Sequence, residues 1–319
     1  MRALWAIVLT LAAQPAASDL VLHQPVDCVL GETCHIQNYV DHNPGPGVSD
    51  FTCGGLSYDG HKGTDFALPT QLEMHNGVDV LAAAPGIVRA VRDTMTDQLY
   101  TPENSASIAG QECGNGVLIA HADGWETQYC HMRLGSVVVK SGDRVETGDV
   151  LGEIGLSGKT QFPHLHLSVR QDGRVVDPFA PDGATDCAVP QQELWDQDIT
   201  YVPGGLTSAG FAEGIPGYDA VLAGTATRTT LPTDANALVI FALAFGSQQG
   251  DVIYMEIHGP EGEVLSQEIV LEKAQAQVYR ATGRRLTSAQ WPAGTYRGEV
   301  AMLRDGAEIS RKTVSVDIR

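Results

Sequence analysis

The stretch QFPHLHLSV, residues 161–169, places two histidines two positions apart, just after a proline. In an extended strand the side chains at i and i+2 lie on the same face, so His164 and His166 share one face. The alternating apolar residues then face a core: they are Leu165, Leu167 and Val169. The stretch therefore predicts a half-buried β-strand whose polar face carries two imidazoles.

The surrounding region repeats this strand pattern. From residue 58 to about residue 182 the chain is a series of short apolar segments broken by glycine, such as VDVLAA, GIVRAV and GVLIAHA. The apolar spacing typical of helices is nearly absent, which predicts an antiparallel all-β domain over residues 58–182. Residues 94–112 are polar and unpatterned, and we expect a long loop over the sheet. Loops of this kind are either functional or mobile insertions.

A second block covers residues 203–319 and follows a linker at 183–202. Its apolar segments, such as ANALVIFALAF and DVIYMEI, are separated by turn sequences such as GPEGE and RDG. Short strands at a spacing of about ten residues predict an antiparallel β-sandwich, here an immunoglobulin-like one. The block contains no residue cluster that suggests catalysis. It is either a positioning or binding module, whose partner the sequence does not identify, or a purely structural appendage.

The N-terminal segment is typical of exported proteins. A basic Arg2, an apolar run and small residues near position 17 predict a signal peptide at residues 1–17. The run is too short to span a bilayer comfortably, and we expect no membrane span elsewhere. Residues 18–57 are rich in turn formers, which predicts an irregular arm tied down by disulfides. The mature protein is expected in the periplasm or cell envelope, or secreted.

The cysteines form an even set, which favours disulfides in an exported chain: Cys28, Cys34, Cys53, Cys113, Cys130 and Cys187. Six cysteines allow many pairings, and the sequence does not choose among them. Cys28 with Cys34, which would close a small loop, is the best single candidate. Cys113 with Cys130 is a second candidate. A hairpin turn at residues 123–124 would place Cys130 opposite Val117, so that bridge requires the chain to bend at residues 114–116.

The net charge of the chain argues against two classes of binding partner. The chain has 20 Lys and Arg against 39 Asp and Glu, a formal net charge of −19. Such a balance argues against binding nucleic acid or an anionic membrane surface by charge. We therefore expect neither as a partner.

Two further stretches contain residues suited to metal or acid–base chemistry. In YDGHKGTDFALP, His61 and Asp65 can converge on one point if Gly63 lets the backbone bend. In TQYCHMRLG, strand alternation predicts that Tyr129 and His131 share one face. The same alternation puts Cys130 on the other face. Each stretch alone fits ordinary surface or structural residues, but three such sites in one compact β domain favour a common functional site.

Together these stretches resemble a known family. HKGTD, GVDVLAAAPGIV, GNGVLIAHADGWETQYCHM, VKSGDRVETGDVLGEIGLSG and PHLHLSV resemble the M23 (lysostaphin- or LytM-type) zinc metallopeptidases, in the family's order and over roughly residues 58–180. The resemblance implies one Zn²⁺ per chain. It places His61 and Asp65 at the ligand positions of HxxxD and His166 at the third ligand position. His131 and His164 match two active-site histidines that do not bind the metal.

The remaining histidines match no functional position of the family: they are His23, His35, His42, His75, His121 and His258. A site with three protein ligands leaves the fourth zinc position for water, whose pKa zinc lowers to about 7. His131 and His164 can then accept the proton of that water or hydrogen-bond the developing oxyanion. Which of the two acts as the base stays open. The resemblance implies a zinc endopeptidase that cuts peptide cross-links or stems of bacterial peptidoglycan.

Some positions depart from the family pattern. Phe162 stands where a small residue is common, and Leu167 and Ser168 stand where an aromatic residue and an acid are common. These departures leave the metal site intact and affect the fit of the substrate on that wall of the cleft. The loop at 94–112 is also longer than the minimal family connection and is expected to shape the cleft.

Two alternatives differ from an active endopeptidase. The first is a non-catalytic LytM-like regulator that activates other cell-wall hydrolases. Such relatives usually lack some of the metal ligands, whereas all five active-site positions are occupied here. The second is a latent enzyme in which the arm at 18–57 covers the zinc, with His35, Asn38 and His42 as candidate occluding groups.

Overall fold

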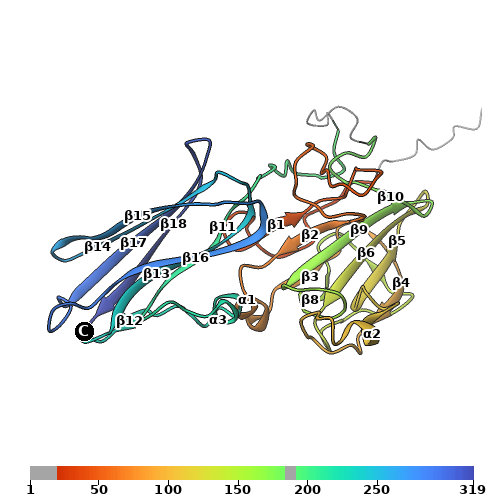
Figure 1. The fold of residues 1–319 in the computed structure, drawn as a ribbon. Coiled ribbons are helices and arrows are strands. Elements are labelled where there is room, and N and C mark those ends of the chain that lie inside the picture. The colour runs from red at the N-terminus through yellow and green to blue at the C-terminus, as the bar shows by residue number, and fades with distance from the viewer. Residues whose placement is uncertain (1–19, 184–191) are drawn as a thin grey trace, which may run out of the picture.

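The computed structural model describes residues 20–183 and 192–319. The predicted signal peptide and Cys187 lie outside the described residues. Strands dominate and almost all of them pair antiparallel, which confirms the all-β prediction (Figure 1). The helices are short: α1 (Gln71–Asn76), α2 (Ser105–Ile108) and α3 (Tyr218–Leu222). Within the described ranges, no helix has both the length and the apolar character that crossing a membrane requires.

The first domain is built on an eight-stranded sheet with the order β1-β2-β9-β6-β5-β4-β7, in which β10 also pairs with β9. Its strands are β1 (His35–Asn38), β2 (Thr64–Ala67), β4 (Gly86–Arg92), β5 (Asn115–Ala120), β6 (Trp125–Met132), β7 (Arg144–Val145), β9 (His164–Gln171) and β10 (Arg174–Val176). A smaller sheet pairs β3 (Asp79–Leu81) with β8 (Val150–Glu153). Side chains of both sheets share one hydrophobic core.

The hairpin between β5 and β6 turns at Asp123 and Gly124, as predicted, and both residues have positive φ (53° and 75°). This is the backbone of a type I′ turn, whose twist suits a two-residue hairpin. The predicted register is wrong by one position, since Val117 pairs with Tyr129 and not with Cys130. The difference arises at the turn end of the hairpin, where Ala120 already pairs with Glu126 and the N–H of His121 donates to the carbonyl oxygen of Trp125. Farther from the turn, β6 carries an extra residue: Val117 is two positions after Asn115, whereas their partners Tyr129 and Met132 are three positions apart.

The arm at 18–57 is part of this domain. The sequence predicts an irregular segment, but the arm contributes an edge strand, β1, which pairs antiparallel with β2. Its side chains also enter the core, where Tyr39 and Phe51 pack edge to face with ring centroids 5.2 Å apart. Burying aromatic rings of this size is a large hydrophobic contribution, so the arm docks as folded structure.

Two of the disulfide candidates are formed. Cys28 is bonded to Cys34, and Cys113 is bonded to Cys130. The second bridge has the bend that it requires, because Gly114 adopts a left-handed conformation with φ 66°. Cys53 is disulfide-bonded as well.

The second domain consists of two facing sheets with a common core. One sheet has the order β11-β13-β16, from β11 (Gly205–Ala212), β13 (Ala237–Ser247) and β16 (Gln275–Arg285). The other has the order β12-β18-β17-β14-β15, from β12 (Thr230–Leu231), β14 (Val252–Gly259), β15 (Gly262–Val270), β17 (Gly294–Arg304) and β18 (Ala307–Ile318). β12 pairs parallel with β18. This arrangement agrees with a sandwich, while the immunoglobulin-like topology and the predicted domain boundaries stay predictions.

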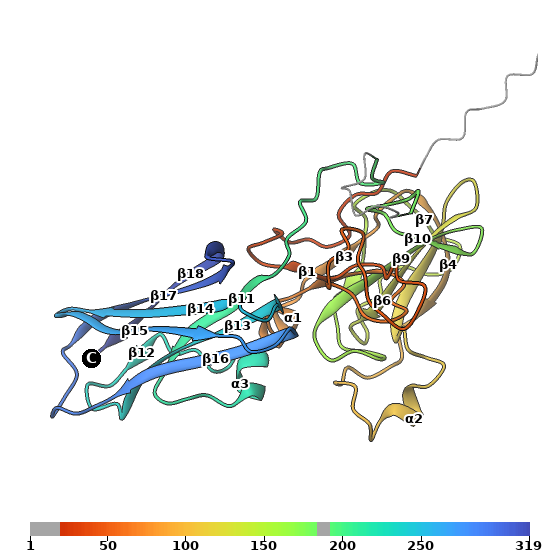
Figure 2. The same cartoon turned by 45° about the horizontal axis from the view of Figure 1, so that its top comes forward.

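The two domains lie side by side, and β1 is on the side of the first sheet that faces the second domain (Figures 1 and 2). The His35 ring packs on Phe245 of β13 with centroids 4.4 Å apart. Gln37 Nε2 donates a hydrogen bond to the carbonyl oxygen of Ala276, at the start of β16, at 2.9 Å. The arm therefore connects the two domains through side chains as well as through the backbone.

Candidate metal centre

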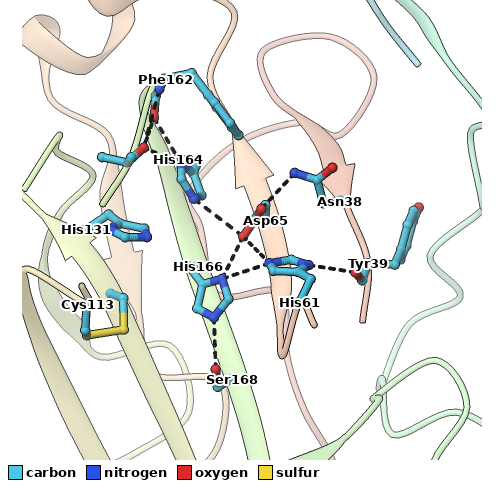
Figure 3. A network of polar contacts seen from close by, with 12 residues as sticks. Asn38, Tyr39, His61, Asp65, Cys113, His131, Phe162, His164, His166 and Ser168 are labelled. Carbon is cyan, nitrogen blue, oxygen red and sulfur yellow. Dashed lines mark hydrogen bonds and ion pairs between the residues drawn. A yellow bond between two sulfur atoms is a disulfide. The ribbon is translucent and has the colours of Figure 1, made fainter. Parts of the chain in front are cut away.

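The register between β2 and β9 sets the geometry of the centre. Asp65 of β2 pairs directly with His166 of β9, and Ala67 pairs with His164. Directly opposite residues of an antiparallel pair project to the same face, so the Asp65 carboxylate lies beside the His166 ring. Leu165 and Leu167 of β9 are fully buried in the core on the other face. The alternation predicted from the HLH stretch is thus present in the structure (Figure 3).

His61 completes a group of three candidate metal-donor side chains, called the metal donors below. Its Nε2 lies 3.2 Å from Asp65 Oδ1 and 3.1 Å from His166 Nδ1, and the last two atoms are 2.8 Å apart. Ligands about 2.0–2.1 Å from a tetrahedral zinc are about 3.3 Å from one another, so the three atoms are close to the separation that zinc requires. Among the described residues, these three form the group of His, Cys, Asp and Glu side chains that could hold a metal ion.

Second hydrogen bonds orient both histidine rings. His61 Nδ1 donates to the carbonyl oxygen of Tyr39 at 2.7 Å, which leaves the Nε2 lone pair free for a metal. His166 Nε2 lies 3.0 Å from Ser168 Oγ, which can accept the ring proton from Nε2 when Nδ1 binds a metal. Such outer partners fix the tautomer and the direction of metal-binding histidines. The donor set, two imidazoles and a carboxylate that each present a free electron pair, fits zinc.

Asp65 has an outer partner of the same kind. Asn38 of β1 donates from Nδ2 to Asp65 Oδ2 at 2.9 Å, while Oδ1 is the atom near the two rings. The arm supports two of the three donors, through Asn38 and through the Tyr39 carbonyl, and neither contact is predicted by the sequence pattern. A backbone carbonyl leaves no signature in the sequence, and the Asn38 contact depends on the pairing of β1 with β2.

The arm lies beside the centre: residues 40–45 line a neighbouring pocket together with His61. The latent-enzyme alternative stays a prediction. His35 packs against Phe245 of the second domain, and His42 Nε2 lies 2.7 Å from Asp177 Oδ2, so neither ring is at the metal donors. Asn38 reaches the site and bonds to a ligand. None of the residues that line the cleft over the centre comes from the arm.

The pKa values of the three candidate donors shift in different directions. Burial raises the pKa of Asp65, but the neighbouring charges on His61 and His164 outweigh burial and hold it well below its usual value. Burial lowers the pKa of His166. For His61 burial acts in the same direction, but the Asp65 carboxylate outweighs it and raises the pKa of the ring. Metal ligands must be deprotonated, so we expect metal binding to release a proton from His61.

His131 reaches the cleft by a route that the sequence did not predict. Alternation places His131 with Tyr129, but Tyr129 is buried in the core, and Cys130 lies on the cleft face opposite His166. The prediction is wrong because β6 carries an extra residue and His131 adopts φ 65°, in the left-handed region. A bulge of this type re-aims the side chain and brings His131 to the same face as Cys130.

The two additional histidines face each other beside the metal donors (Figure 3). The rings of His131 and His164 have centroids 4.7 Å apart. His131 Nδ1 donates to the carbonyl oxygen of Ser157 at 2.9 Å, which leaves Nε2 unprotonated. Burial, followed by the neighbouring imidazoles, lowers the pKa of His131 well below its usual value. His164 Nδ1 donates to the Phe162 carbonyl at 2.9 Å, and its Nε2 lies 3.4 Å from Asp65 Oδ1.

The loop at 94–112 braces the segment that holds these two rings. Asn115 Oδ1 accepts hydrogen bonds from the backbone N–H groups of Thr94 and Met95, at 2.9 and 2.8 Å. The N–H of Tyr100 donates to the carbonyl oxygen of Thr160 at 2.7 Å. Thr160 and Ser157 contact His164 and His131. The predicted loop over the sheet thus supports the histidines, and its last residue, Glu112, lines the cleft.

The centre opens to a cleft of about 580 Å³. His61, His131 and His166 line it together with charged side chains, whereas Asp65 and His164 are buried behind them (2% and 4% exposed). Gly63 lets the segment from His61 to Asp65 pack closely against β9. A Cβ at this glycine would lie 2.7 Å from His166 Cε1 and 2.5 Å from the Leu167 carbonyl oxygen. The glycine is thus required because there is no space for a side chain, and not only because it permits a bend.

Comparison with known proteins agrees with this geometry. Residues 59–178 match the model of Peptidase family M23, which confirms the resemblance of the first domain to that family. The DD-carboxypeptidase/endopeptidase Mpg of Neisseria meningitidis serogroup B is 30% identical over 140 residues, 43% of this chain and 25% of that protein. The peptidoglycan DD-endopeptidase ShyA of Vibrio cholerae is 29% identical over 134 residues, 42% of this chain and 26% of that protein.

The chain therefore spans about a quarter of the length of these curated relatives. Among solved structures, the catalytic domain of the prophage-encoded M23 protein EnpA from Enterococcus faecalis is 26% identical, with a TM-score of 0.32. The likeness covers 48% of this chain and 93% of that one.

Proposed function

We propose, on the premise that residues 59–178 form an M23-type domain, that this domain is a zinc endopeptidase which hydrolyses peptide bonds in bacterial peptidoglycan. The observation that carries the proposal is the convergence of His61 Nε2, Asp65 Oδ1 and His166 Nδ1 beside His131 and His164, at the base of a cleft that His61, His131 and His166 line. The substrate class, cross-links or stem peptides, is supported by the names of two relatives, a DD-carboxypeptidase/endopeptidase and a peptidoglycan DD-endopeptidase.

One zinc ion per chain would be held by His61, Asp65 and His166, where it would lower the pKa of a water molecule and polarise the carbonyl of the scissile bond. His131 takes the proton of the attacking water at its unprotonated Nε2 and passes it to the departing amine. His164, whose ring faces His131, can donate to the oxygen that gains negative charge when its Nε2 also carries a proton, because its Nδ1 proton is already bonded to the Phe162 carbonyl. Ser157 and Phe162 hold the two rings in place through their carbonyl oxygens.

The proposed substrate implies a cellular location for the protein. Peptidoglycan lies outside the cytoplasm, and the predicted signal peptide at 1–17 is consistent with export. The strongly acidic composition, with a net charge of −19, fits a resident enzyme of the periplasm or cell envelope better than a secreted lytic enzyme. The function of the second domain and its partner are outside this proposal.

The test uses the full mature chain. Bound metal is measured on the purified protein, which is then incubated with intact peptidoglycan while new amine ends are quantified. Wild type is expected to hold one zinc and release amines, and a chelator should stop release. His61→Ala should lose both zinc and release, whereas His131→Ala should keep zinc and lose turnover. His75→Ala, which changes an exposed histidine on α1, should change neither.

A different result would favour the regulator. If wild type binds no zinc and releases no amines, yet increases amine release by a separate cell-wall hydrolase, the endopeptidase proposal is wrong.

A further inference from the structure

We propose that the cleft contains a subsite for a substrate carboxylate, formed chiefly by Arg170 with Lys159 and Lys62. This inference rests on the endopeptidase proposed above and adds a specificity to it: the enzyme selects peptides that carry a free carboxylate near the scissile bond.

The charge of the cleft is opposite to that of the chain. The whole sequence has 39 acidic against 20 basic residues, but the cleft lining contains three cations, Lys62, Lys159 and Arg170, and one acid, Glu112. None of the three cations forms an ion pair with an acidic side chain in the described part of the chain. Positive side chains that gather without partners in a cleft raise the local concentration of anionic ligands.

The three cations come from separate parts of the domain. Lys62 follows the metal donor His61, Lys159 lies in the segment that holds the rings of His131 and His164, and Arg170 lies on β9. A zinc ion with two neutral imidazoles and one carboxylate keeps a net positive charge. Further cations beside it repel that charge, and an anionic substrate offsets the repulsion.

The position and the hydrogen bond of the Arg170 side chain suit the binding of a carboxylate. It shares the cleft face of β9 with His166 and Ser168, because the three residues are spaced by two. One terminal nitrogen of its guanidinium donates to Gln128 Oε1 on the neighbouring strand β6. The guanidinium keeps further N–H groups, and its planar shape matches a carboxylate through paired hydrogen bonds.

Lys159 is fixed at a different point of the same cleft. Its backbone N–H donates to the carbonyl oxygen of Glu112 at 2.8 Å, and its ammonium lies 5.7 Å from the centre of the Tyr100 ring. A cation over an aromatic face is stabilised by the negative face of the ring. Lys159 and Arg170 therefore have defined positions without an ion pair. Lys159 nevertheless acts on the nearby Glu112 carboxylate, whose pKa is lowered by backbone N–H hydrogen bonds and then by the charge of Lys159.

The position of Arg170 defines where the substrate carboxylate lies. His166 and Arg170 are four strand residues apart, which corresponds to about 13 Å along the backbone. The reach of the arginine side chain shortens this separation, so an extended peptide cut at the metal centre would place a carboxylate about two to four residues from the scissile bond. Peptidoglycan stem peptides, which carry free carboxylates at short intervals, fit this requirement.

The test compares two synthetic cross-linked stem peptides that differ only in whether the carboxylates near the scissile bond are free or converted to carboxamides. Wild type is expected to cleave the free acid with a kcat/KM about tenfold or more above that of the amide. Arg170→Gln should remove most of this preference by raising KM for the acid, with kcat nearly unchanged. Lys159→Gln should reduce the preference less. Arg174→Gln is the matched control, because Arg174 is exposed on β10 and does not line the cleft.

Binding of both peptides, measured by calorimetry on the zinc-loaded protein, separates the two proposals. If wild type prefers the acid in binding but cleaves neither peptide, the subsite stands and the endopeptidase proposal is wrong. If wild type cleaves both peptides with equal kcat/KM, and Arg170→Gln and Lys159→Gln leave KM and binding unchanged, the subsite is refuted while the endopeptidase stands.

Discussion

The backbone N–H of His131 donates a hydrogen bond of 2.8 Å to the carbonyl oxygen of Cys113, whose sulfur is bonded to that of Cys130, the residue before His131. These two links hold His131 in a left-handed conformation, with φ 65°. For a residue other than glycine this conformation costs about 1–3 kcal/mol and persists only when its surroundings enforce it. The disulfide is thus part of the structure that presents His131 to the cleft.

We expect the double variant Cys113→Ser/Cys130→Ser to lower kcat at least tenfold while keeping zinc. The reason is that His131 relaxes from its strained backbone, whereas the metal donors lie on β2, β9 and the turn before β2. Kinetics and metal content are compared below the unfolding temperature. Cys28→Ser/Cys34→Ser serves as the control and should lower stability with little change in kcat. Equal kcat values for the first variant and wild type would contradict this role.

Gly63→Ala should weaken zinc binding at least tenfold. The new Cβ would lie 2.7 Å from the His166 ring and 2.5 Å from the Leu167 carbonyl oxygen, so a metal donor must move. Competition with a coloured chelator measures the affinity. Gly55→Ala provides the comparison, because a Cβ there meets nothing within 4 Å, and it should bind zinc as wild type does. Unchanged affinity in Gly63→Ala would show that the close packing at this glycine does not position His166.

Ser168→Ala should lower zinc affinity about 10- to 100-fold, the usual effect of removing an outer partner of a metal-binding histidine. The hydroxyl of Ser168 accepts the hydrogen bond that directs His166 Nδ1 to the metal. Ser141→Ala, at an exposed serine that bonds only to the Arg89 carbonyl, should leave the affinity unchanged. The same competition assay applies, and equal affinities for the two variants would refute the role of Ser168.

Asn38→Ala tests whether Asn38 supports the metal centre or blocks access to it, because the two roles predict opposite changes in turnover. Because Asn38 Nδ2 donates to Asp65 Oδ2, its loss should lower both zinc affinity and turnover. An occluding residue would have the opposite effect, and its removal would increase turnover. Metal content and the rate of amine release, measured on the same preparation, determine which description holds.

Stability should fall in mild acid through His35. Burial is the main cause that lowers the pKa of this ring, from 6.5 to about 4. Below pH 6.5 the unfolded chain binds a proton that the folded chain refuses, so stability is complete above pH 6.5 and declines toward pH 4 by up to about 3 kcal/mol. Urea unfolding at pH 7 and pH 4.5 measures the decline. His35→Gln should show a smaller loss between these two pH values, and an equal loss in both proteins would contradict this role.

The sequence was sufficient for the all-β fold and for the shared face of His164 and His166, because a spacing of two in a regular strand determines the side-chain direction. It failed at His131, where one extra residue in β6 and one left-handed φ reverse the direction that alternation predicts. A β-bulge depends on contacts with the neighbouring strand, and those contacts cannot be predicted from the apolar and polar pattern of a single strand.

The sequence pattern also does not predict which groups form hydrogen bonds to the metal donors. The Tyr39 carbonyl is a backbone group that any residue could supply, and Asn38 becomes relevant only once β1 pairs with β2. The cations of the cleft come from positions 62, 159 and 170, which the fold of the domain brings together. The convergence of these three side chains depends on tertiary structure, and local residue patterns do not predict it.

The contacts that β1 makes with the metal donors have a practical consequence for anyone who expresses the domain alone. A fragment trimmed to the segment that matches the family model, residues 59–178, would discard Asn38 and the carbonyl that holds His61, and would leave β2 as an unprotected sheet edge. Weak metal loading or aggregation of such a fragment would therefore reflect the missing upstream strand and not an inactive enzyme. Activity assays are better performed on protein that begins no later than residue 20.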